Sequence, residues 1–137
     1  MRAVLGLVLS VLAVNPLLAQ EAETPWRDAV NAQIEAFRTG DAETALEYAG
    51  AAFKNTYKDA ASFLADVERA GYAPIVSSRT HSFGSFREFG ETAVIQIVNL
   101  VGPDQSLYEA AYQLANEPDE GWRVQGVVMR KTEGMGI

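Results

Sequence analysis

The fold of this chain follows from one stretch at residues 93–130, AVIQIVNLVGPDQSLYEAAYQLANEPDEGWRVQGVVMR. Apolar, β-branched and aromatic side chains dominate residues 93–101, 107–115 and 122–130, as is typical of β-strands. The two connections, residues 102–104 and 117–121, combine proline, glycine and aspartate, which favour turns. Connections this short join neighbouring antiparallel strands. The stretch therefore predicts consecutive strands of one antiparallel sheet.

Upstream of this stretch, apolar residues recur every three or four positions instead of every second position. This spacing predicts helices. The first helix opens at Thr24-Pro25, where threonine is a good N-cap and proline suits the first helical position, and it ends at Gly40. Its apolar face consists of Trp26, Val30, Ile34 and Phe37.

Two shorter helices follow, each opened by an aspartate that can cap it. Asp41 begins a helix with an inner face of alanine and leucine that ends at Gly50. Asp59 begins a helix that Gly71 and Pro74 end. Residues 75–81 and 83–89 are expected to form short, irregular strands. Helices followed by a strand meander predict an α+β fold, with N-terminal helices packed on a curved antiparallel sheet, in a single domain over residues 20–131.

The first residues have the features of an export signal. Arg2 precedes an apolar run over residues 3–14, and Ala19 supplies a small residue for cleavage, with Ala22 as the alternative. The run is shorter than the ~20 residues of a spanning helix, which disfavours an uncleaved anchor. The chain has no cysteine to carry a lipid. We therefore expect a periplasmic or secreted protein that starts near Gln20, with a flexible tail over residues 132–137.

Charge and composition exclude several kinds of partner. The chain has a net charge of −7, which becomes −8 once the signal and its Arg2 are removed. An acidic surface repels nucleic acid and anionic membranes, so we expect neither as a partner. The absence of cysteine excludes disulfides, and the single histidine leaves too few ligands for a zinc site. No metal and no cofactor is expected.

Several motifs resemble those of known families. The stretch QIEAFRTGD at residues 33–41 and GWRV at residues 121–124 resemble the nuclear transport factor 2-like superfamily. Together with ALEYA, F…AGYAP ending at Pro74, and GWRVQGV, they resemble more narrowly the exported bacterial family called domain of unknown function 4864. The resemblance implies a cone-shaped fold, in which a sheet wraps a helix and often encloses a pocket. It carries over no catalytic or binding residue.

Chemistry inside such a cone would need an inward carboxylate or a histidine. The acids after residue 75 fall at turns, in the tail or, for Glu109, on the polar face of a strand. His81 is the only histidine and has no evident partner in the sequence, although Asp66 or Tyr57 could approach it in space. No catalytic residue is therefore assigned.

Four polar residues allow two interpretations of the cone. In one, Tyr57, His81, Gln96 and Tyr112 are the polar groups of a pocket whose apolar wall accepts a small apolar molecule. In the other, which these residues alone favour because none of them specifies a ligand, the cone is filled and the same side chains are hydrogen-bonded core groups. The function predicted is non-enzymatic binding of an apolar small molecule or a protein partner. The alternatives are an enzyme like the ketosteroid isomerases, using His81 or a tyrosine, and a purely structural or assembly protein.

The sheet also predicts self-association. Residues 93–101 are apolar on both faces, and only one face can cover the helices. The other face would present an apolar patch, which usually marks an interface. A homodimer across this outer face is the preferred interpretation, and burial by loops and residues 75–89 is the alternative. The residues expected in the patch are Ile95, Ile97, Val127 and Met129.

Overall fold

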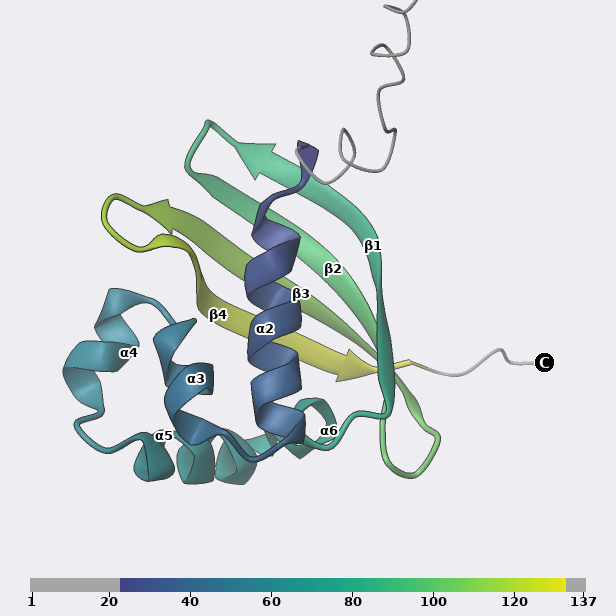
Figure 1. The fold of residues 1–137 in the computed structure, drawn as a ribbon. Helices are drawn as coiled ribbons and strands as arrows, with labels where there is room; N and C mark the ends of the chain where they lie inside the picture. The colour runs from purple at the N-terminus through teal and green to yellow at the C-terminus, as the bar shows by residue number, and fades with distance from the viewer. Residues whose placement is uncertain (1–22, 133–137) are drawn as a thin grey trace, which may run out of the picture.

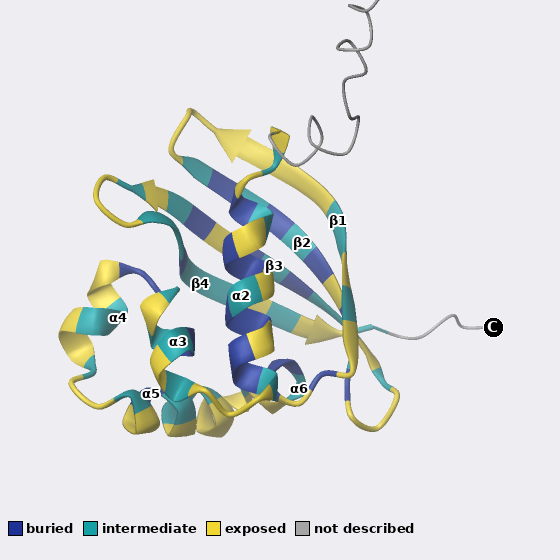
Figure 2. Ribbon diagram, viewed as in Figure 1, coloured by how far each residue is buried: buried dark blue, intermediate teal, exposed yellow. Residues whose placement is uncertain are grey.

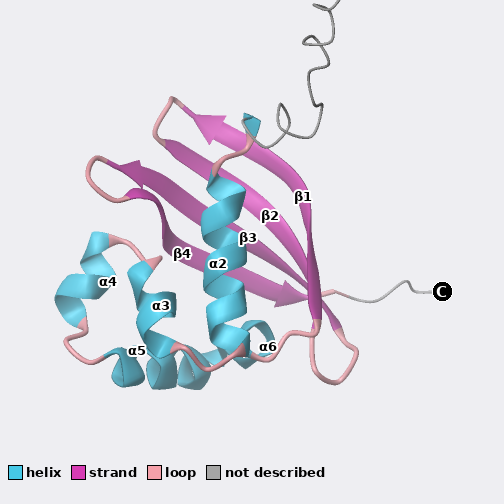
Figure 3. Cartoon of the chain, viewed as in Figure 1, coloured by secondary structure: helices cyan, strands magenta, loops and turns pink. Residues whose placement is uncertain are grey.

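The computed structural model of the chain describes residues 23–132 and has N-terminal helices followed by a four-stranded antiparallel sheet (Figure 1). The strands lie in the order β1-β2-β3-β4, so each strand pairs with its neighbour in sequence (Figure 3). The predicted α+β class is confirmed. The predicted export signal, its cleavage site at Ala19 and residues 133–137 of the predicted tail lie outside the described residues.

The bounds of the elements are as follows. The helices are α2 (Trp26–Arg38), α3 (Ala42–Glu47), α4 (Ala51–Thr56), α5 (Ala60–Val67) and α6 (Ala73–Val76), and the segment η2 (Glu68–Tyr72), which is kinked at Gly71, joins the last two. The strands are β1 (Thr80–Phe89), β2 (Ala93–Val101), β3 (Leu107–Glu117) and β4 (Gly121–Lys131). Within residues 23–132, no helix has the length and hydropathy needed to cross a membrane.

Helix α2 lies across the sheet and carries much of the core on its inner face (Figure 2). All of the side chains predicted for that face are buried. The helix begins one residue later than predicted, because Pro25 is the N-cap and the Thr24 carbonyl accepts a hydrogen bond from the amide of Arg27 at 3.1 Å. Burial of this apolar face, rather than a side-chain cap at Pro25, fixes the helix on the sheet.

The second predicted helix is shorter than expected. Its cap is confirmed, since Asp41 accepts a hydrogen bond from the amide of Thr44, but α3 ends at Glu47. Ala49 instead forms a parallel bridge to Val124 of β4, held by Tyr48 O and Gly50 N. Gly50 is the N-cap of α4, a helix that was not predicted from the sequence.

The segment after α5 also departs from prediction. Asp59 caps α5 as expected, through the amide of Ala61. Pro74 does not end the helical region but occupies the first turn of α6, where its missing N–H is no loss. Ile75 is therefore buried in a helix, and of the strand predicted over residues 75–81 only Thr80 and His81 are in a strand, at the start of β1. β1 is one strand with a bulge between Phe83 and Phe86, not a separate pair of short segments.

The register of the sheet decides which side chains face the helices. Residues opposite one another in antiparallel strands share a face. On β2 and β3 the alternation is as predicted, with Gln96 opposite Tyr112 and Val98 opposite Ala110 on the inner face. Ile95 and Ile97 lie on the outer face, opposite Gln113 and Ala111.

A β-bulge in β4 reverses the predicted faces of its second half. Leu114 pairs with Val124, whereas Gln113 pairs with Gly126, so Gln125 is an extra residue in β4. Val127 is therefore opposite Tyr112, and Met129 is opposite Ala110, so that both pack against the core. The expectation that Val127 and Met129 lie on the outer face is corrected. Val128 takes the outer position and is 64% exposed.

Candidate functional site

A cavity of about 270 Å³ lies between the helices and the β3–β4 half of the sheet. Helices α2, α4, α5, η2 and α6 and strands β3 and β4 all contribute to its wall. The wall is almost entirely apolar, so it suits an apolar guest. The lining residues are Gln33, Phe37, Ala49, Phe53, Phe63, Val67, Tyr72, Ile75, Tyr112, Val124, Gly126 and Val127.

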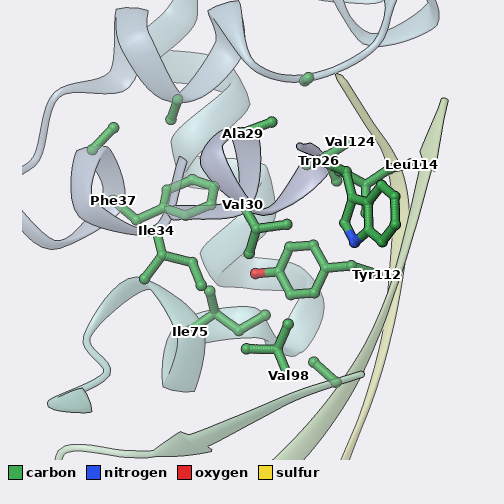
Figure 4. Close-up of a cluster of buried hydrophobic side chains, with 14 of the residues drawn as sticks. Trp26, Ala29, Val30, Ile34, Phe37, Ile75, Val98, Tyr112, Leu114 and Val124 are labelled. Carbon is green, nitrogen blue, oxygen red and sulfur yellow. The ribbon is translucent and has the colours of Figure 1, made fainter. Parts of the chain in front are cut away.

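Tyr112 lies beside this wall and carries a buried hydroxyl. Its ring extends from β3 toward α2, and its hydroxyl oxygen lies near Val30, Ile34 and Ile75 (Figure 4). The side chain is completely buried, and no described group forms a hydrogen bond with the hydroxyl. Burial raises the pKa of Tyr112 well above its usual range, so the hydroxyl stays protonated at physiological pH. A buried hydroxyl without a partner is uncommon and requires an explanation.

Gln33 is the second polar residue of the wall with an unused atom. It lies on α2 and is buried, and its Nε2 donates a hydrogen bond to the carbonyl of Ala45 at 3.0 Å. In the part of the chain that the structure describes, its Oε1 has no hydrogen-bond donor. Gln33 Oε1 is therefore an acceptor left on the cavity wall, whereas the buried Tyr112 hydroxyl has almost no surface that a guest could touch.

A surface groove adjoins the cavity and shares Phe53, Phe63, Val67 and Tyr72 with it. Polar groups stand along this groove. The Tyr57 hydroxyl donates a 2.7 Å hydrogen bond to Asp66, and Arg69 pairs with the same carboxylate at 2.8 Å.

Tyr72 lies at the boundary between groove and cavity, and its hydroxyl donates to the carbonyl of Val127 at 2.7 Å. It belongs to η2, where Gly71 has a positive φ of 103° that favours glycine. Gly71 thus produces a kink between α5 and α6 beside Tyr72.

Gln96 is buried beside Tyr112 but does not line the cavity. Its Oε1 accepts hydrogen bonds from Trp26 Nε1 at 2.8 Å and Arg27 Nε at 3.0 Å. Its Nε2 donates to the carbonyls of Gly84 and Ile97 at 3.0 and 2.9 Å. Gln96 thus joins the start of α2 to the bulge of β1, and its polar atoms are occupied within the protein.

His81 lies on β1, away from the cavity wall. Its Nδ1 is 2.9 Å from Arg38 Nη2, and its Nε2 is 2.7 Å from Asn31 Oδ1. An arginine can only donate, so Nδ1 accepts and Nε2–H donates, which describes a neutral imidazole. Burial, and secondarily the Arg38 guanidinium, lower the pKa of His81, while Glu35 opposes them. Asp66 and Tyr57, suggested as partners from the sequence, hydrogen-bond to one another, and His81 hydrogen-bonds to Asn31 and Arg38 instead.

Comparison with known proteins identifies the family. The family described as Domain of unknown function (DUF4864) matches residues 19–137. The chain belongs to this family. No curated protein and no solved structure matched the chain. The wider resemblance to the nuclear transport factor 2-like superfamily stays a prediction.

The structure of this DUF4864 domain separates the four predicted site residues. Tyr112 lines the cavity and Tyr57 lines the adjoining groove, whereas Gln96 and His81 line neither. Within residues 23–132, no cluster of three or more His, Cys, Asp or Glu side chains could hold a metal ion.

Other residues of the wall were not apparent from the sequence. Gln33 was hidden within the apolar spacing of α2, although a glutamine one residue before Ile34 could have indicated a buried polar group. Phe53 lies on the unpredicted helix α4, and Val127 was assigned to the wrong face.

Proposed function

We propose that this DUF4864 domain is a non-enzymatic binding protein that holds a small apolar molecule in the cavity between α2, α5 and the β3–β4 half of the sheet. The observation that carries the proposal is the almost entirely apolar cavity of about 270 Å³ between the helices and the sheet. Few polar groups in an otherwise apolar wall are typical of small-molecule sites.

Two features favour binding over the alternatives. Among the described residues that line the cavity, none is a carboxylate or a histidine, so the wall offers no general base of the kind that isomerases use. A purely structural domain would gain from filling the cavity and from bonding Tyr112, because unfilled volume and an unpaired hydroxyl both reduce stability.

The proposal is tested by titrating the purified domain with propylbenzene, an apolar probe of suitable size, and following backbone amide chemical shifts. We expect saturable shifts that centre on residues of the cavity wall. Val67→Trp should abolish them, because Val67 lines the cavity and the larger ring would fill it. Ala65→Trp is the matched control, since Ala65 is exposed on the same helix. Absence of saturable shifts in the unmutated domain would refute the proposal.

We also propose that the domain acts outside the cytoplasm, after removal of residues 1–19. The support is the sequence of Arg2, the apolar run and Ala19. Intact mass of protein released from the periplasm should begin near Gln20. A full-length chain confined to membranes would contradict this.

A second copy of the chain is the partner that we propose for the outer face of the sheet. The helices cover only the inner face, and Ile95, Ile97, Ala111 and Val128 share the outer one (Figure 1). Arg87 and an Arg130–Glu109 pair also lie there, so this face lacks the excess of acid found in the whole chain. Like-charge repulsion between copies is therefore smallest there, and a two-fold contact would cover the patch with its own copy.

A further inference from the structure

We infer that the molecule held in the cavity presents a neutral hydrogen-bond donor, such as a hydroxyl, to the side-chain oxygen of Gln33. The inference rests on the proposed binding function and adds the polar group of the guest and its place on the wall. It depends on the orientation of the Gln33 amide, on the surface left to its oxygen, and on the other groups of the wall.

Helix α3 fixes the orientation of the Gln33 side-chain amide. Nε2 lies 3.0 Å from the carbonyl oxygen of Ala45, and a carbonyl can only accept a hydrogen bond. The nitrogen must therefore face α3, because the exchanged orientation would bring two acceptors together. The oxygen Oε1 is left with no donor among the residues that the structure describes.

Gln33 Oε1 also keeps surface that a guest can touch. Both Gln33 Oε1 and the Tyr112 hydroxyl lack a described partner, but only the hydroxyl has lost almost all of its accessible surface. Gln33 lines the cavity, and the whole residue is only 3% exposed. The small surface that remains to its oxygen is therefore in contact with the cavity, where a guest can reach it.

The rest of the wall determines what should meet this oxygen. Among the described lining residues, the other polar side chains are Tyr72 and Tyr112, and the Tyr72 hydroxyl already donates to the carbonyl of Val127. A hydrocarbon would separate Gln33 Oε1 from solvent without replacing its hydrogen bond, which is unfavourable in a buried site. A guest with a donor at this point avoids that loss.

The donor must be neutral. No lysine, arginine or carboxylate is among the described residues that line the cavity. Burying an ammonium group without a counter-charge is strongly unfavourable. The adjoining groove carries Asp66 and Arg69, but they are paired with one another there and do not line the cavity. The polar group that fits is therefore a hydroxyl, as in an alcohol or a phenol, or an amide N–H.

The test compares 4-ethylphenol with 4-methylanisole by calorimetric titration. The two probes are isomers with one oxygen each, but only the phenol can donate a hydrogen bond. We expect 4-ethylphenol to bind the unmutated domain more tightly, and Gln33→Met to reduce its advantage over 4-methylanisole about three- to tenfold. The ratio of the two affinities isolates the hydrogen bond, because a change in packing or stability in Gln33→Met acts on both isomers.

Two further variants and one spectrum control the comparison. Val67→Trp should abolish binding of both isomers, which assigns them to this cavity. Asn55→Leu removes an amide from an exposed position of α4 and should leave the ratio unchanged. In the unmutated domain, the Gln33 side-chain amide protons should show nuclear Overhauser contacts to the ring protons beside the phenol hydroxyl. This last measurement does not depend on the folding of Gln33→Met.

Three outcomes would overturn the inference. The first is equal affinity of the two isomers for the unmutated domain, which would show that the site does not select a donor. The second is an unchanged ratio in Gln33→Met, which would show that the hydroxyl meets another group. The third is Overhauser contact of Gln33 with the ethyl group of the phenol alone, which would reverse the orientation of the guest. Failure of both isomers and of propylbenzene to bind would instead refute the proposed function.

Discussion

Gln96 and Tyr112 are opposite one another on β2 and β3 and are both fully buried, but their polar atoms differ in what they bind. Gln96 hydrogen-bonds to the start of α2 and to the bulge of β1. The Tyr112 ring is longer and carries its hydroxyl beyond the sheet, into the layer of apolar helix side chains. The first residue therefore joins parts of the fold through hydrogen bonds, and the second leaves its hydroxyl without a described partner.

Strand alternation was enough to place both residues on the inner face. It could not distinguish their roles, because the partners of Gln96 come from Trp26 and Arg27, about seventy residues earlier in the chain. The same limitation applied to His81, whose contacts with Asn31 and Arg38 form only when α2 lies beside β1.

His81 gives a prediction about pH. Its pKa is below the ordinary 6.5 in the folded protein, because burial and Arg38 disfavour the charged ring more than Glu35 favours it. The unfolded chain therefore binds a proton at a higher pH than the folded one does. The neutral ring contributes stability above about pH 6.5, and this contribution is lost as the pH falls through the folded-state pKa.

The check is urea unfolding of the unmutated domain and His81→Gln between about pH 5.5 and 7.5. The free energy of unfolding of the unmutated domain should fall more steeply toward acid than that of His81→Gln. Because His81 is the only histidine, it is the only side chain with an ordinary pKa inside this range. Parallel pH profiles, or a steeper fall in the variant, would contradict the assignment.

Among the helices and strands, the repeat of apolar residues predicted the long elements but not the short ones. α2, β2, β3 and β4 lie within about two residues of the predicted bounds, because each has a sustained apolar repeat. α4 and α6 have no such repeat, at six and four residues, and tertiary contacts define them. The bulges in β1 and β4 could not be predicted from the sequence either. One extra residue moves the side chains that follow to the other face of the sheet without changing the amino-acid composition of the strand.

The bulge in β4 predicts opposite effects for two adjacent valines. Val127 lies on the inner face at the cavity, and Val128 lies exposed on the outer face. We expect Val127→Ala to lower the free energy of unfolding by about 1–2 kcal/mol, through lost burial of its methyl groups. Val128→Ala should change it by less than about 0.5 kcal/mol in dilute solution.

Urea unfolding at submicromolar protein concentration measures both valine variants, because self-association contributes least there. A strand without a bulge in this half would put Val128 inside, as strict alternation from Val124 requires. If Val128→Ala lowered the free energy of unfolding more than Val127→Ala does, the β3–β4 register described after Gln125 would be wrong.

At the scale of the whole molecule, the helices and the sheet form two layers with an unequal distribution of apolar surface. The helix layer covers one face of the sheet, and no described element covers the other (Figures 1 and 2). The uncovered face carries Ile95, Ile97, Ala111 and Val128 at its centre, with Gln113 and Asn99 among its neighbours. Polar residues around an apolar centre are the usual composition of a protein interface.

The proposed homodimer predicts which substitutions produce monomers. Val128→Lys and Ile97→Lys place a charge at the centre of the outer face, where a two-fold contact would bring it beside its own copy. We expect sedimentation equilibrium of the unmutated domain at micromolar concentration to give a dimer mass, and either variant to give a monomer mass. Ala52→Lys is the control, because it adds the same charge at an exposed position of α4 and should leave the dimer intact. A monomer mass for the unmutated domain, or a dimer mass for both outer-face variants, would refute this interface. If Ala52→Lys also gave a monomer mass, the cause of dissociation would be the net charge or the helix layer, and not the outer face of the sheet.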